Sequence, residues 1–194
     1  MNCIIACQQS WCFGLAEQLH KATDHQFTEI TEKSQLTLMA LDKVKPDYIF
    51  FPHWSDLIPE EIHARYQCVI FHMTDLPYGR GGSPLQNLVI RGHRHTMISA
   101  IKCVQELDAG PIYLKERLSL HGSAENIFLR ASGVIESMII KILSERPKPF
   151  EQEGEITIFN RRTPEQSDWS DASTLDEVHD RIRMLDAEGY PPAF

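Results

Sequence analysis

The alternation of apolar, strand-like runs with helix-like segments over the first half of the chain is the feature that most constrains its fold. Residues 47–52 and 67–71 are short and almost continuously apolar, which is typical of strands buried on both faces of a sheet. Residues 3–6 and 26–30 predict two further strands, and segments with helical spacing of apolar residues separate the four. The pattern therefore predicts an α/β fold with a mostly parallel central sheet flanked by helices.

The pattern changes after residue 92. Residues 96–102 and 110–120 predict a pair of strands that form a hairpin, and residues 123–143 predict a long amphipathic helix. A linker rich in proline and charge follows, then an edge strand at 157–159 and a last helix at 174–185, for which Thr174 and Glu177 provide an N-terminal cap. We expect one α/β domain at 1–145 and a C-terminal extension of linker, strand and helix at 146–194.

The charge balance narrows the classes of partner. The 194-residue chain carries a formal net charge of −8, whereas proteins that bind nucleic acid normally present a basic surface, so we expect no nucleic-acid partner. The start of the chain has no basic region of a signal peptide, and no apolar run approaches the ~20 residues of a membrane span. We therefore expect a cytoplasmic protein without a membrane partner.

The cysteines and paired histidines do not predict a metal site. The five cysteines form no CxxC pair, and three of them, Cys3, Cys7 and Cys12, fall within one strand-to-helix turn, a poor arrangement for tetrahedral ligands. His93 and His95 have the spacing of one strand face, but no Cys or Asp cluster accompanies them. We expect reduced thiols and no metal.

The stretch "FHMTDLPYGRGGSPLQ" at residues 71–86 leaves the fourth predicted strand with a histidine and then three glycines in a short loop. In an open parallel sheet, ligands bind at the carboxyl ends of the strands, where the loops at 7–12, 52–58 and 72–83 should meet. The glycines match neither the phosphate loop nor the dinucleotide motif. They would permit backbone geometry that a side chain would block, and close approach of a ligand to the backbone.

His72 has two possible roles. A lone histidine at a strand exit is often structural, whereas a histidine that acts as a base near neutral pH needs a carboxylate to orient it. The segment "ELDAGPIYLK" places such a carboxylate, Asp108, at a turn before a strand. The spacing alone does not decide whether the two side chains meet.

Together, these two segments resemble the folate-dependent formyltransferases. The strand-exit motif of that family reads roughly Asn-x-His-x-Ser-Leu-Leu-Pro, followed by a Tyr-Arg-Gly-x-x-Pro loop, and residues 70–77 and 79–84 here read Ile-Phe-His-Met-Thr-Asp-Leu-Pro and Gly-Arg-Gly-Gly-Ser-Pro. The aspartate motif of the family, Asp-x-Gly-x-Ile, corresponds to residues 108–112. The separation of 36 residues between His72 and Asp108 also agrees with the family.

The resemblance implies a Rossmann-like formyltransferase fold, with residues 1–145 as the catalytic domain. It also implies transfer of a formyl group from 10-formyltetrahydrofolate, the co-substrate, to an amine. The segments "RRTPEQSDW" and "GYPPAF" resemble the tail of sugar N-formyltransferases. We therefore expect a nucleotide-linked amino sugar, carried on dTDP or UDP, as the acceptor in the biosynthesis of lipopolysaccharide or another surface polysaccharide, with a homodimer as a possible assembly.

Two alternatives stay open. One is a formyltransferase that acts on methionyl-tRNA or on a purine precursor; the acidic charge and the few residues after 150 disfavour the tRNA enzyme, which carries a basic C-terminal domain. The other is a non-catalytic relative that binds folate or a sugar.

The resemblance also implies roles for individual residues. His72 and Asp108 are the expected catalytic pair. The residues expected to contact the co-substrate are His53, Trp54, Leu57, Ile58 and Asp108. The residues expected to contact the acceptor are Tyr78, Arg80, Gly81, Gly82, Gln86 and Arg161. Trp54 could instead cover the core, and Arg80, Arg161 and Arg162 could be solvated surface residues.

One departure from the family pattern concerns the reaction itself. Ile70 stands where the family has an asparagine that donates a hydrogen bond to the formyl oxygen. Such a donor contributes about 2.7–4 kcal/mol to the transition state. Protonated His72, a backbone N–H of the glycine loop, Gln86 or Asn87 could replace it.

Overall fold

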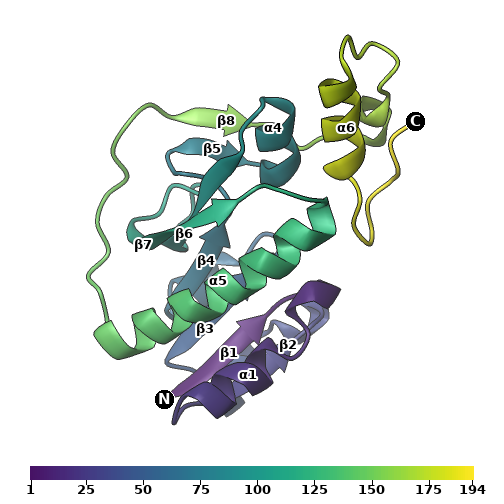
Figure 1. Ribbon diagram of the computed structural model, residues 1–194. Coiled ribbons are helices and arrows are strands. Elements are labelled where there is room, and N and C mark those ends of the chain that lie inside the picture. The colour runs from purple at the N-terminus through teal and green to yellow at the C-terminus, as the bar shows by residue number, and fades with distance from the viewer.

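The protein is described by a computed structural model that covers residues 1–194 (Figure 1). Its centre is a six-stranded sheet in the order β2-β1-β3-β4-β6-β7. The four strands on the N-terminal side run parallel, β6 is antiparallel to β4, and β7 is antiparallel to β6. The strands are β1 (Asn2–Ala6), β2 (Gln26–Ile30), β3 (Tyr48–Pro52), β4 (Cys68–His72), β6 (His95–Lys102) and β7 (Ile112–Ser119). The predicted α/β fold with a mostly parallel sheet is confirmed.

Helices cover both faces of the sheet. α1 (Leu15–Ala22) and the long α5 (Ala124–Glu145) lie on one face, and α2 (Leu38–Val44) and α3 (Glu60–His63) lie on the other. Figure 1 shows α5 crossing the strands diagonally, with α1 beside it. The predicted helix at 34–44 is interrupted, because the Thr37 side chain accepts a hydrogen bond from the Ala40 N–H and so caps α2 at that point. A 3₁₀ turn, Lys33–Gln35, precedes the cap.

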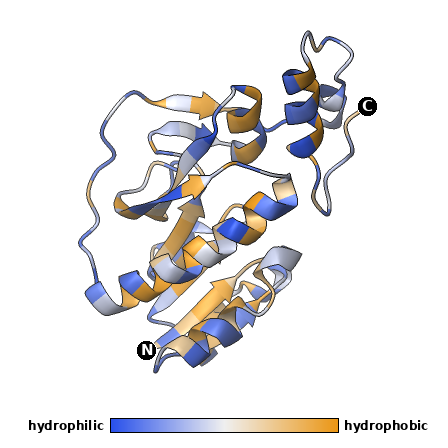
Figure 2. Ribbon diagram, in the orientation of Figure 1, coloured by the Kyte–Doolittle hydropathy of each residue, from blue (hydrophilic) through white to orange (hydrophobic).

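The central strands β1, β3 and β4 are largely buried on both faces, as the sequence of β3 and β4 predicts. Successive side chains point to opposite sides, so Ile5 packs under α1 and α5 while its neighbour Ile4 packs against the helices of the other face. Figure 2 shows the corresponding apolar strands at the centre and polar outer helix faces. The Cα of Ile70 in β4 pairs with those of Phe51 and Ile101, which places the exit of β4 in the middle of the sheet.

A second, two-stranded sheet was not predicted from the sequence. Part of the expected glycine loop is a strand, β5 (Tyr78–Gly81), which pairs in parallel with β8 (Thr157–Phe159). A Cβ on Gly81 would lie 2.4 Å from the Phe159 carbonyl oxygen, so only glycine lets the two strands approach. The loop assignment for residues 78–81 was wrong because the strand partner lies almost eighty residues away.

The C-terminal extension supplies β8 of this second sheet and then packs against α4 (Pro84–Ile90). The connection from α5 to β8, residues 146–156, contains no helix or strand and runs along the outside of the molecule (Figure 1). After β8, one 3₁₀ turn is followed by the helix α6 (Leu175–Arg183), which contacts α4. Thr174 caps α6 by accepting a hydrogen bond from the Glu177 N–H, as predicted. The remaining short turns are Ser10–Cys12 and Pro164–Ser167.

None of the helices combines the length and apolar character that a bilayer crossing would require.

Candidate active site

A cavity of about 720 Å³ lies where the carboxyl ends of the parallel strands β1, β3 and β4 meet. The chain leaves these strands through the loops that begin at Cys7, His53 and Met73. Parallel strands end at the same edge of the sheet, so their exit loops surround one space. The cavity size is that of a typical small-molecule site.

The side chains of His72 and Asp108 lie next to each other in the wall of this cavity. His72 Nδ1 lies 3.5 Å from Asp108 Oδ2, and each side chain is only 8% exposed. His72 ends β4, and Asp108 lies in the turn between β6 and β7, with a left-handed φ of 52°. The sequence named both residues but not their contact, which depends on the antiparallel pairing of β4 with β6.

The second ring nitrogen of His72 fixes the position of its proton. His72 Nε2 lies 2.7 Å from the Gly79 carbonyl oxygen. A carbonyl can only accept a hydrogen bond, so Nε2 carries the proton and donates it to Gly79. In the neutral ring, Nδ1 is therefore the basic nitrogen, and it is the nitrogen that faces Asp108.

Asp108 is held from the side of the glycine loop. Its Oδ2 accepts a hydrogen bond of 2.9 Å from the Gly81 N–H. The same carboxylate oxygen thus has a fixed position relative to both β5 and His72. We call the side of the cavity formed by His72, Gly81, Gln86 and Asp108 the polar wall.

Aromatic side chains form another part of the lining, which we call the aromatic wall: Trp11, His53, Trp54, Phe128 and Tyr190. Phe128 of α5 stacks between Trp11, with ring centroids 4.4 Å apart, and Tyr190 of the C-terminal tail, at 5.8 Å. His53 contacts both Trp11 and Phe128 edge-on.

The aromatic wall contains buried nitrogen atoms without hydrogen-bond partners. They are Trp11 Nε1, His53 Nε2 and Trp54 Nε1, which make up all but one of the buried side-chain polar atoms of the protein that lack a partner. Burial also lowers the pKa of His53 to about 4, so its ring is neutral at physiological pH. His53 has a left-handed φ of 49°, a conformation that is unusual outside glycine.

Most of the residues predicted for the site line this one cavity: His53, Trp54, Leu57, Ile58, His72, Gly81, Gly82, Gln86, Asp108 and Arg161. Gly82 leaves room for the chain after β8, since a Cβ on it would lie 2.7 Å from the Arg161 Cα.

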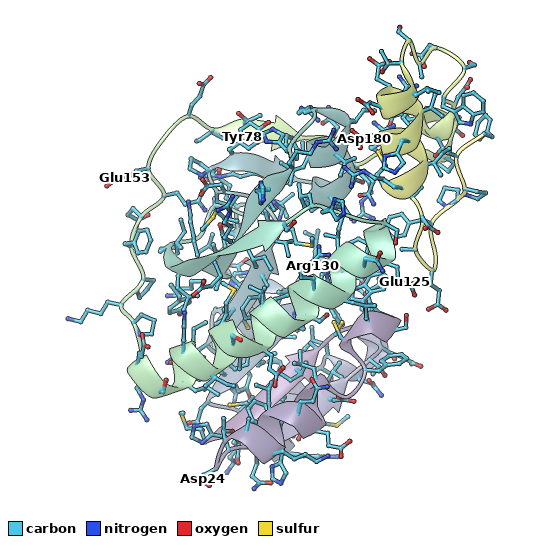
Figure 3. All side chains as sticks on the ribbon, viewed as in Figure 1. Asp24, Tyr78, Glu125, Arg130, Glu153 and Asp180 are labelled. Carbon is cyan, nitrogen blue, oxygen red and sulfur yellow. The ribbon has the colours of Figure 1, made fainter.

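Tyr78 and Arg80 do not reach the cavity, although both were expected to contact the acceptor. The Tyr78 hydroxyl lies 3.1 Å from His93 Nε2 and its ring packs edge-on against Phe159, near the outer side of β5 (Figure 3). The Arg80 side chain is buried and bonds to Gln152 and Glu106. Alternation along β5 explains the second difference: Arg80 and its neighbour Gly81 face opposite directions.

Ile70 lines the cavity on the same face of β4 as His72, and it offers no hydrogen bond to a ligand. The Asn87 amide cannot replace the missing donor because it already donates to the carbonyl groups of Gly82, Ser83 and Asn160. The glycine-loop N–H groups at Gly81 and Gly82 are also engaged. Of the proposed replacements, His72 and Gln86 remain on the cavity wall, although one N–H of the Gln86 amide already donates to the Met184 carbonyl oxygen.

Several lining residues were not predicted from the sequence, notably Trp11, Leu107, Phe128, Ile158 and Tyr190. Trp11 could have been predicted, because it lies in the loop after β1 and the loops that follow parallel strands meet at one edge of the sheet. Phe128 and Tyr190 come from a helix and a tail that reach the cavity only through tertiary packing, and nothing local marks them.

Comparison with known proteins identifies the family. The family model described as "Formyl transferase" matches residues 13–126, and the model described as "Methionyl-tRNA formyltransferase, C-terminal domain" matches residues 164–194. The chain belongs to the formyl transferase family. The predicted family membership is thus confirmed, while the branch within the family needs correction.

Two relatives show where the correction lies. A solved structure, methionyl-tRNA formyltransferase from Clostridium thermocellum, is 51% identical, with a TM-score of 0.96 over 100% of this chain and 87% of that one. Methionyl-tRNA formyltransferase from Bacillus cytotoxicus is 29% identical over 78% of this chain, which spans only 50% of the length of that relative. In contrast, a 4-N formyltransferase from Francisella tularensis is 14% identical, covering 99% of this chain and 90% of its own with a TM-score of 0.74, and shows the fold alone.

The expectation of a nucleotide-linked amino sugar as acceptor was therefore wrong, and so was the exclusion of a nucleic-acid partner. The first error came from the tail segments 161–169 and 189–194: residues 164–194 match the C-terminal domain of methionyl-tRNA formyltransferases. The second error came from the net charge of −8, from which a nucleic-acid partner was excluded. The total charge of a protein does not describe the local charge around one site.

Proposed function

We propose that this protein transfers the formyl group of 10-formyltetrahydrofolate to the α-amino group of methionyl-tRNA. The observation that carries the proposal is the buried pair of His72 and Asp108 on the wall of a cavity, in a chain of this family. The matches to methionyl-tRNA formyltransferases favour this acceptor over other amines. Such a reaction would take place in the cytoplasm, where aminoacylated tRNA is found.

The residues of the polar wall suit the chemistry of the transfer. A bond forms between the amine nitrogen and the formyl carbon, and the amine loses a proton. The bond from that carbon to the folate nitrogen breaks, and the folate nitrogen gains a proton to give tetrahydrofolate. His72 Nδ1, held basic by the Nε2–H bond to Gly79, accepts the proton that the amine loses. Asp108 Oδ2, 3.5 Å away, stabilises the positive charge that develops on the ring.

The aromatic wall and its neighbours suit a flat, polar-edged co-substrate. Trp54, Leu57 and Ile58 line the cavity beside the exit of β3, and the unpartnered nitrogen atoms of His53 and Trp54 could donate to or accept from a ligand. The residues present thus fit a folate, which combines a ring with hydrogen-bonding edges.

Arginines at the mouth of the cavity suit an acceptor with phosphate groups. Arg161 and Arg162 follow β8 and line the cavity. The arginine ion pairs of the chain involve other arginines, so these two charges have no carboxylate partner. We expect them to contact the phosphates of the tRNA acceptor end.

Formation of formyl-methionine tests the proposal. Purified protein is incubated with 10-formyltetrahydrofolate and initiator tRNA charged with radioactive methionine, and the amino acid is analysed after hydrolysis of the ester. We expect N-formylmethionine with this acceptor and none with uncharged tRNA. Absence of the formyl product at saturating concentrations of both substrates would contradict the proposal.

Ile70 supports a second function, folate binding without transfer. The site has no amide at this position, so a transition state with charge on the formyl oxygen has one donor fewer. Calorimetric binding of tetrahydrofolate by a protein that forms no N-formylmethionine would favour this second function.

A further inference from the structure

Gln152 is the residue that links the outer connection of the chain to the polar wall. It lies in the segment 146–156, which joins α5 to β8 outside the sheet (Figure 1). Phe150, two residues earlier, exchanges two backbone hydrogen bonds with Ile112 of β7, so this part of the connection has a defined register. The sequence predicted only a linker here.

The Gln152 amide makes four hydrogen bonds, two with each of its polar atoms. Its Nε2 donates to the carbonyl oxygens of Asp108, at 2.7 Å, and Gly110, at 2.9 Å. Its Oε1 accepts from Arg80 Nε, at 3.1 Å, and Arg80 Nη2, at 2.9 Å. Only a side chain with both a donor and an acceptor group of this length can satisfy both partners.

These bonds close a ring around Asp108. Arg80 and Gly81 are neighbours in β5. The Gly81 N–H donates to the Asp108 carboxylate. Arg80 donates to the Gln152 amide, which in turn donates to the Asp108 carbonyl oxygen. The left-handed backbone of Asp108 is thus fixed at both its main chain and its side chain. Arg80 is 9% exposed and does not line the cavity, so its role in this ring is not one of ligand contact.

We infer that Gln152 is a positioning residue that holds the Asp108 carboxylate in place against His72. Loss of its two donated bonds frees the turn that carries Asp108, and a displacement of even 1 Å at a reacting group costs about 100-fold in rate. The consequence for turnover rests on the formyl transfer proposed above, whereas the consequence for the His72 ring does not depend on it.

The first test measures the His72 ring directly. Protein with ¹⁵N-labelled histidine is compared by NMR as wild type, Asp108→Asn and Gln152→Glu, with the His72 signals assigned by their loss in His72→Asn. Gln152→Glu keeps the size of the side chain and the acceptor for Arg80 but removes both donors to the Asp108 turn. We expect the ring nitrogen signals of His72 to move in the same direction in Gln152→Glu as in Asp108→Asn.

A neighbouring exposed residue supplies the control. Glu153 follows Gln152, lies on the outer connection and makes no side-chain hydrogen bond or ion pair with the rest of the chain (Figure 3). Glu153→Gln should leave the His72 signals unchanged. If His72 is unchanged in Gln152→Glu while Asp108→Asn moves it, the inference is wrong. If Gln152→Glu does not fold, Gln152→Met, which keeps the length without the charge, answers the same question.

The second test uses turnover. We expect Gln152→Glu to lower kcat about 100-fold while the KM for 10-formyltetrahydrofolate stays within about threefold of wild type. In the Asp108→Asn background the same substitution should add little, because Gln152 acts through that carboxylate. Multiplication of the two losses would contradict the inference. A wild-type protein that forms no formyl product would instead refute the proposed function, and the NMR comparison would still decide the role of Gln152.

Discussion

The two walls of the cavity differ in how complete they are without a ligand. On the polar wall, His72 and Asp108 are held by fixed partners at Gly79 and Gly81, and the Asp108 turn is braced by Gln152. On the aromatic wall, three buried nitrogen atoms have no partner at all. An unpaired buried polar group costs about 1–3 kcal/mol, so the aromatic wall is the side on which a ligand gains most from hydrogen bonding.

The contrast separates two tasks of the site. Groups that move protons must be in position before the reaction, and the polar wall satisfies this through backbone contacts that only glycine permits. Groups that select a ligand gain by leaving their hydrogen bonds unmade until the ligand arrives. Substitutions on one wall should therefore change a different property of the site from substitutions on the other.

The largest effect is expected from Gly110, which supports the polar wall. A Cβ at this position would lie 1.7 Å from the Lys102 carbonyl oxygen, so Gly110→Ala must displace the β6–β7 connection that carries Asp108. We expect the free energy of unfolding to fall by about 4 kcal/mol or more, as measured by urea denaturation.

Gly133 is the matched control. It lies in α5 with no atom near the position of a Cβ, so Gly133→Ala should stabilise the protein by about 0.5–1 kcal/mol. Equal effects of the two substitutions would show that the packing around Gly110 has no special role.

The elements that form the polar wall were only partly predictable from the sequence. The exit of β4 at His72, the hairpin of β6 and β7 and the long helix α5 were predictable, because each follows from local periodicity. The pairing of β5 with β8 and the bond from Gln152 to Asp108 were not, because they join segments separated by 40 residues or more in the chain. The motif for Asp108 identified the residue, but its partners depend on that tertiary structure.

Ile70 offers the next largest effect and tests whether the polar wall lacks a donor. Ile70→Asn places an amide on the cavity side of β4, two residues before His72. If the formyl oxygen lies there, kcat should rise by about 10²–10³-fold, the converse of removing such a donor. Single-turnover formyl transfer measures the change. Ile70→Val, which adds no donor, is the control, and equal rates in the two variants would place the oxygen elsewhere.

The pH dependence of stability tests whether the His53 ring in the aromatic wall is held neutral. Its pKa is about 4 in the folded protein because of burial, below the usual value of 6.5, so the unfolded chain binds a proton that the folded chain does not. Stability from this residue is therefore present above pH 6.5 and is lost as the pH falls toward 4. The loss is expected to reach about 3 kcal/mol.

A comparison of variants isolates this contribution. Urea denaturation at several pH values between 4 and 6.5 should show a shallower decline for His53→Gln than for wild type. His121→Gln changes an exposed histidine and should leave the decline unchanged. The same decline in His53→Gln as in wild type would mean that the ring is not held neutral.

The smallest effect is expected at the mouth, where Arg161 and Arg162 lie. Replacing both with alanine should weaken methionyl-tRNA binding roughly tenfold and reduce the salt dependence of binding by about one unit of log–log slope for each lost phosphate contact. Arg117, exposed on β7 without an ion pair, is the control. An unchanged slope in the double variant would show that Arg161 and Arg162 do not contact the tRNA phosphates.

The central claim is that His72 and Asp108 act as one unit, and a double-mutant cycle tests it most directly. Single-turnover formyl transfer is measured for wild type, His72→Asn, Asp108→Asn and the double variant. We predict that each single substitution lowers the rate about 10²–10⁴-fold and that the double variant is about as slow as the slower single one. Losses that multiply, or a wild-type rate in either single variant, would contradict the claim.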